Sequence, residues 1–168
     1  MASVAREVEL RCGGDEAACR LVSPVGLRCF PGLSPGPGDL PAVAEHEFEL
    51  PYLGTRRQLT ELRAERSAAD ARHEVVVSGS GPLISYAARW SIGNRGDGRP
   101  ASLTFEYEVS DALLIDAVNE LRSRSPLPFR SDADAILRLA VGEAFLDYFG
   151  RVMAEYADAV RARLEARA

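Results

Sequence analysis

The sequence of 168 residues has no long hydrophobic run. No stretch approaches the roughly 18 apolar residues of a membrane span, and residues 1–7 lack the uninterrupted apolar segment of a secretory signal. Cysteine is scarce too, since Cys12, Cys19 and Cys29 are the only three and no two of them have CxxC spacing. We therefore expect a soluble cytoplasmic protein with three reduced thiols, which serve as small buried hydrophobic residues.

Positive charge is in deficit, because 20 basic residues face 25 acidic ones and are scattered among them, for a net charge of −5. A domain without a basic stripe gains no free energy from counterion release, so nucleic acid is not an expected partner. Histidine is also scarce: His46 and His73 fall on different expected strands, without Cys, Asp or Glu at metal-ligand spacing. Neither a metal site nor a cofactor is expected.

Alternation of apolar and polar residues predicts strands in the first two thirds of the chain, which reads as one domain over residues 1–168. Val4 and Val8 share one face of a first strand, and His46 and Phe48 share one face of a second strand. Further strands are expected over residues 55–66, 73–78, 84–92 and 101–109, with loops or turns at 34–39, 67–70, 79–82 and 94–98.

Apolar residues at helical spacing predict helices over residues 15–22, 25–30, 112–124 and 132–163. The third of these is expected to bury Leu114, Val118 and Leu121. The last one carries an apolar stripe long enough to cross a whole domain. Because nothing else can cover the apolar faces of the last two strands, we expect this helix to pack across an antiparallel sheet.

Short motifs accompany this order of elements. Residues 29–33 read CFPGL after the two small helices, residues 48–50 precede Leu53 and Gly54, residues 77–81 precede the long strands, and Phe145 and Phe149 lie near the end. Order and motifs together resemble the START-like, helix-grip (SRPBCC) superfamily, and within it the family of the G-type subunit of carbon monoxide dehydrogenase. Residues 111–131 depart from that family, because they form a longer and more polar connection.

The resemblance implies an α+β helix-grip fold. In that fold a curved antiparallel sheet of six or seven strands, two short helices and a long C-terminal helix enclose an apolar cavity. Members of the superfamily hold lipids, quinones or polyketides there, and some catalyse while many only bind or carry. The resemblance therefore implies a cavity and does not choose a chemistry.

Aromatic residues dominate the side chains expected between sheet and helix. As a pure core this set is ordinary, and the resemblance makes it a candidate ligand site. Gly142 and Gly150 interrupt an otherwise good helix at a cost of about 1 kcal/mol each, which predicts that ligand or strand approaches the helix closely there. The candidate ligand-binding residues are Phe30, His46, Phe48, Tyr86, Trp90, Phe105, Tyr107, Val141, Phe145, Tyr148 and Phe149.

Three functions are compatible with this pattern. The preferred one is a binding or carrier protein for an apolar small molecule such as a quinone, lipid or polyketide-like ring. The second is a cyclase or dehydratase in which Tyr86, Tyr107 or His46 acts as an acid, although no catalytic pair is evident in sequence. The third is an accessory factor whose charged strand face around residues 56–65 makes transient contact with a membrane or a membrane-associated oxidoreductase.

Overall fold

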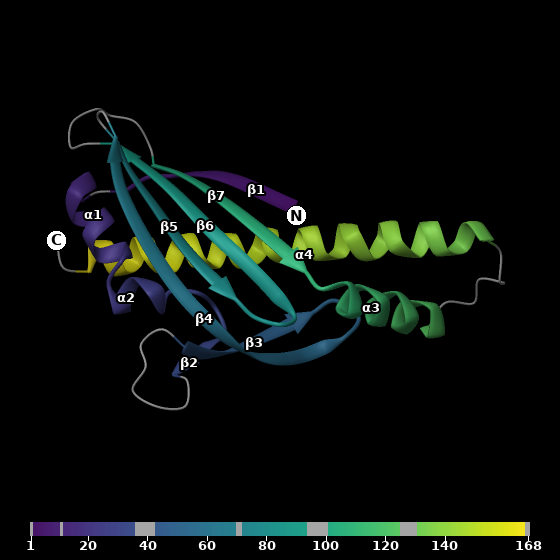
Figure 1. The fold of residues 1–168 in the computed structure, drawn as a ribbon. Coiled ribbons are helices and arrows are strands. Elements are labelled where there is room, and N and C mark those ends of the chain that lie inside the picture. Colours follow the sequence, from purple (N-terminus) through teal and green to yellow (C-terminus); the bar gives the residue numbers. More distant parts are fainter. Residues whose placement is uncertain are drawn as a thin grey trace.

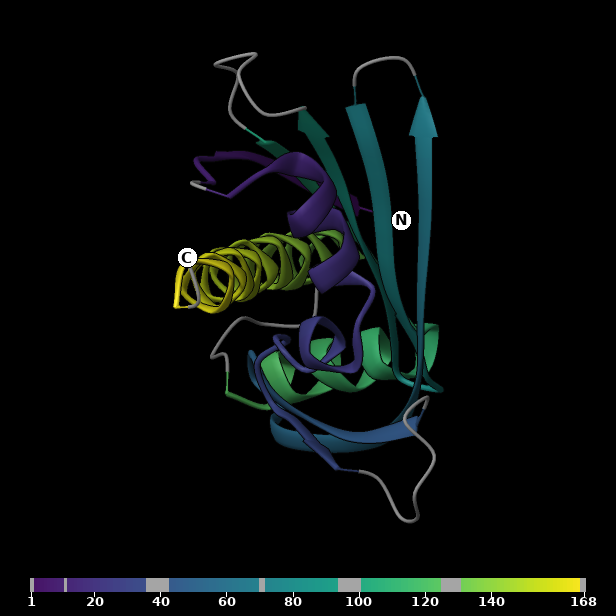
Figure 2. The same ribbon diagram turned by 90° about the vertical axis from the view of Figure 1, so that its left-hand side faces the viewer.

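The computed structural model describes residues 2–10, 12–35, 43–69, 72–93, 101–124 and 131–166. These residues form one seven-stranded antiparallel sheet, in the order β1-β7-β6-β5-β4-β3-β2, together with helices that lie on one side of it (Figures 1 and 2). The strands are β1 (Ala2–Val8), β2 (Leu33–Pro35), β3 (Val43–Leu50), β4 (Gly54–Ala69), β5 (Arg72–Ser80), β6 (Ile84–Gly93) and β7 (Ala101–Val109). The helices are α1 (Gly14–Leu21), α2 (Pro24–Leu27), α3 (Asp111–Arg124) and α4 (Ser131–Glu165).

Strands β3 to β7 form a meander in which each strand pairs with the next one along the chain. Strand β1 closes one edge of the sheet by pairing with β7, where Val4 lies opposite Phe105. Strand β2 closes the other edge against β3. The expected α+β class and the expected antiparallel sheet of six or seven strands are therefore confirmed.

The two faces of the sheet differ as the alternation predicts. Along β6 and β7, buried side chains alternate with more exposed ones, and Trp90, Leu103 and Phe105 point inward. Helix α4, about 52 Å long at 1.5 Å per residue, crosses this inner face and then extends beyond the sheet beside α3 (Figure 1). Within the described part of the chain, no helix combines the length and the apolar character that a membrane span requires.

Several boundaries differ from the sequence prediction. Leu33–Pro35 was expected in a loop but pairs with β3 as β2, and β4 continues to Ala69 through the turn expected at 67–70. Strand β5 likewise includes Gly79 and Ser80, where a break was expected. In each case a neighbouring strand offers backbone hydrogen-bond partners, which outweigh the local turn preference. The expected turn at 94–98 and the break at 125–128 lie outside the described residues.

Two helices also differ in detail. Helix α2 covers Pro24–Leu27 and so begins one residue earlier and ends three residues earlier than the range predicted. Helix α3 buries Leu113, Ala117 and Val118, whereas the expected Leu114 and Leu121 are only half-buried. The packed face of α3 is rotated by about one residue, because α3 packs against α4 beyond the end of the sheet (Figure 1).

The three cysteines do not share one environment. Cys29 is buried, Cys12 is half-buried and Cys19 is exposed. The expectation that all three are buried is therefore wrong for Cys19, which lies on the outer side of the short helix α1.

Candidate functional site

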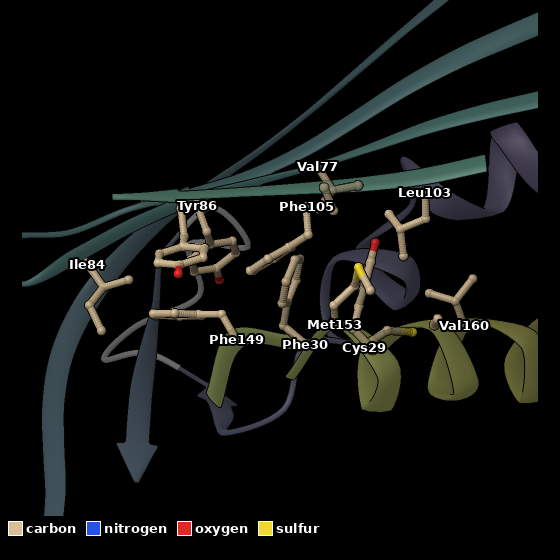
Figure 3. Packing of buried hydrophobic residues seen from close by; sticks show 14 of the residues in the cluster. Cys29, Phe30, Val77, Ile84, Tyr86, Leu103, Phe105, Phe149, Met153 and Val160 are labelled. Carbon is tan, nitrogen blue, oxygen red and sulfur yellow. The ribbon is translucent and has the colours of Figure 1, made fainter. Parts of the chain in front are cut away.

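The candidate residues do gather between the sheet and the helices. Ten of the eleven are buried, and Tyr148 is half-buried. Strands β3, β6 and β7 contribute one group and α4 contributes another, while Phe30 enters from the segment that follows α2 (Figure 3). Their burial was predictable from period-two and helical spacing, because both patterns specify one inward face.

These rings pack against one another. Phe30 lies between Tyr86 and Tyr156, with ring centroids 4.4 Å and 4.1 Å away. Tyr107 stacks on Phe149 at 4.0 Å (Figure 3). Separations of 4–6 Å are those of rings in direct contact, so aromatic side chains occupy much of the space in which the sequence predicted an open cavity.

His46 forms a buried polar chain with its neighbours. Its Nε2 lies 2.9 Å from the Pro31 carbonyl oxygen, which can only accept, so Nε2 carries the proton and donates. Its Nδ1 then accepts from the Tyr86 hydroxyl at 3.2 Å. Burial lowers the pKa of His46 to about 4 and the Pro31 carbonyl opposes this in part, while burial raises the pKa of Tyr86. Both groups are neutral and occupied near pH 7.

A second buried polar contact joins the sheet to α4. The indole nitrogen of Trp90 donates to the Tyr156 hydroxyl at 3.2 Å. In the described residues, every buried side-chain nitrogen or oxygen has a hydrogen-bond partner. The hydroxyls and the imidazole of this interior thus satisfy one another, and none is left aimed at a ligand.

His73 is far from this chain of contacts. It is buried on β5 beside Arg66, whose guanidinium lies 3.4 Å from its Nδ1. Across the described ranges, no group of three or more His, Cys, Asp or Glu side chains is placed to hold a metal ion.

The glycines of α4 do not have the role expected of them. A Cβ atom built on Gly142 or on Gly150 meets nothing within 4 Å. Neither position therefore permits close approach of a strand, and the prediction drawn from their presence is wrong. The close approach is made instead at Gly26 of α2, where a Cβ would lie 2.4 Å from the Arg20 and Leu21 carbonyl oxygens.

A pocket of about 250 Å³ lies elsewhere, between α1, α2 and the C-terminal end of α4. Apolar atoms form most of its wall, and charged or polar side chains occur at only a few points. Its lining residues are Arg20, Leu21, Ser23, Gly26, Cys29, Val160, Arg163, Leu164 and Ala166.

Polar contacts fix the walls of this pocket. Arg20 donates to the Leu164 carbonyl oxygen at 2.8 Å and also pairs with Glu16, so its guanidinium ties the end of α4 to α1. Ser23 caps α2 by accepting from the Gly26 amide at 3.3 Å. Burial raises the pKa of the Cys29 thiol, although the Arg163 charge opposes the shift, so the thiol is protonated near pH 7.

Sequence reasoning missed this pocket. Leu21 belonged to the predicted stripe of the first short helix, and Val160 and Leu164 belonged to the stripe of the last one. The signal available was that the last stripe continues to Leu164, where it meets α1, α2 and their connections. Three helix ends that meet at one place pack less completely than a helix on a sheet, but their meeting depends on tertiary structure.

Comparisons with known proteins leave the family of this chain open. No family model matches the sequence, and no curated protein matches it. A crystal structure described as a conserved protein from Geobacillus kaustophilus is similar at 11% sequence identity and a TM-score of 0.47, over 96% of this chain and 91% of that one.

Proposed function

We propose that this chain is a START-like, helix-grip domain that binds or carries a small hydrophobic molecule in the pocket between α1, α2 and the end of α4. The observation that carries the proposal is a pocket of about 250 Å³ whose wall is mostly apolar. A water molecule occupies about 30 Å³, so the pocket has room for roughly eight to ten non-hydrogen atoms. Such a ligand gains free energy when its apolar surface leaves water.

The alternative functions have less support. The groups named as catalytic acids, His46 and Tyr86, are 2% and 5% exposed and bind each other, so a substrate has no access to them. On the charged strand face, Arg57 pairs with Glu47 and Arg63 pairs with Glu61, all well exposed. Exposed pairs of this kind contribute about 0–1 kcal/mol and indicate a solvated surface.

Calorimetric titration with 1-octanol, a neutral probe of nine non-hydrogen atoms, tests the proposal. Leu164→Trp should place an indole in the pocket, so octanol binding is lost while the melting temperature holds. Ala162→Trp is the matched control, because Ala162 is exposed on the same turn of α4 and does not line the pocket. If the wild type binds no octanol, or if both variants bind it equally, this pocket is not the ligand site.

A further inference from the structure

The two arginines of the pocket differ in how far their charges are already used. Arg20 is held by the Leu164 carbonyl oxygen and by Glu16. Arg163 lies in the last turn of α4, is exposed, and forms no ion pair with a carboxylate of the described residues. The pocket therefore has one guanidinium with unused hydrogen-bond donors at its edge.

The field of Arg163 reaches the interior of the pocket. Its charge acts on the Cys29 thiol, which lines the same pocket and lies against α4 (Figure 3). Two features that would repel an anion are also offset, because Arg20 covers the terminal Leu164 carbonyl and neutralises Glu16. Glu165 is the other acidic group near this end of α4, and its charge acts on Cys12.

We propose that the ligand of this pocket is a monocarboxylate, whose acid group pairs with Arg163 while its hydrocarbon part lies against Leu21, Val160 and Leu164. A guanidinium presents paired N–H donors that match the two oxygens of a carboxylate. One uncommitted positive charge balances one negative charge, which favours a monoanion over a phosphate ester. The volume fits a chain of about six to eight carbons. This inference depends on the proposed function, since it assigns the head group of the same ligand.

The test compares octanoate with 1-octanol, which has the same chain length and no charge, by calorimetric titration at pH 7.5. We expect the wild type to bind octanoate at least about tenfold more tightly than octanol, as a charge-assisted hydrogen bond allows. Arg163→Gln should remove this preference and leave octanol binding unchanged, and Arg163→Lys should restore part of it. Arg161→Gln is the matched control, because Arg161 pairs with Asp158 and does not line the pocket.

The outcomes separate the two proposals. Equal binding of octanoate and octanol, or an octanoate preference that survives in Arg163→Gln, overturns the monocarboxylate inference and leaves the proposed function standing. Binding of neither probe overturns both.

Alkylation of Cys29 locates the ligand independently. In a variant with Cys12→Ser and Cys19→Ser, Cys29 is the only thiol, and octanoate should slow its reaction with iodoacetamide severalfold. Arg163→Gln in the same background should abolish this protection. An alkylation rate that does not change at saturating octanoate would show that the acid binds elsewhere.

Discussion

His46 shows how a single buried residue makes stability depend on pH. The folded protein holds a neutral imidazole whose pKa is about 4, and the ordinary value is 6.5. Above pH 6.5 neither the folded nor the unfolded chain protonates this residue. Between pH 6.5 and 4 the unfolded chain binds a proton that the folded chain excludes, so this range is where stability falls.

We therefore expect acid to destabilise the wild type more than His46→Gln. Each pH unit inside the window costs about 1.4 kcal/mol, so at pH 5 the wild type should lose about 2 kcal/mol more, relative to pH 7.5, than the variant. Urea unfolding at both pH values measures the difference. Tyr86→Phe is the control, since it removes the hydrogen bond to Nδ1 and keeps the titrating imidazole. Equal pH dependence in wild type and His46→Gln would contradict the assignment.

Helix α4 illustrates what an element's sequence reveals about its packing. Its existence and length follow from the apolar stripe, and Leu137, Val141 and Phe145 are buried as that stripe predicts. Farther along, Phe149 and Met153 are buried while the expected Val152 is half-buried. Burial recurs every four residues, so the packed face rotates as α4 passes from α3 to the sheet and then to α1. Helical spacing alone cannot predict this change of neighbours.

Two glycines in different helices should respond oppositely to alanine. Gly142→Ala should stabilise the protein by about 0.5–1 kcal/mol, because the added Cβ meets no other atom within 4 Å and reduces the entropy of the unfolded chain. Gly26→Ala should destabilise it by about 1–3 kcal/mol, because the Cβ would lie 2.4 Å from two carbonyl oxygens. Thermal melts of both variants measure the contrast, and a loss of stability in Gly142→Ala would show that α4 has a neighbour there.

For the whole molecule, the central question is whether the space between sheet and α4 is filled. Val141 is 1% exposed, between Leu137 and Phe145 on the packed face. Val141→Trp should therefore overpack the interior and cost about 1–3 kcal/mol. Leu139→Trp is the matched control, because Leu139 is 66% exposed on the same stretch of α4 and its substitution should cost little. Denaturant unfolding measures both.

A melting temperature that holds in Val141→Trp would contradict a filled interior and return the ligand site to the aromatic residues. The sequence predicted that these residues lie inside, because alternation and helical spacing specify inward faces. It could not predict how fully they fill the interior. That depends on contacts such as Phe30 against Tyr156, which join residues 126 positions apart, as 156 − 30 shows. The pocket at the helix ends was unpredictable for the same reason.

The pairing of β1 with β7 has a consequence for how the chain is made. Val4 waits for Phe105, which is 101 residues later, as 105 − 4 shows. At a synthesis rate of about 5–20 residues per second, β1 leaves the ribosome roughly 5–20 seconds before its partner exists. During that interval β3 to β6 can pair as successive hairpins, whereas β1 must avoid other chains. Exposed Arg6 and Glu7 place charge on the waiting strand, which opposes edge-to-edge aggregation until β7 is available.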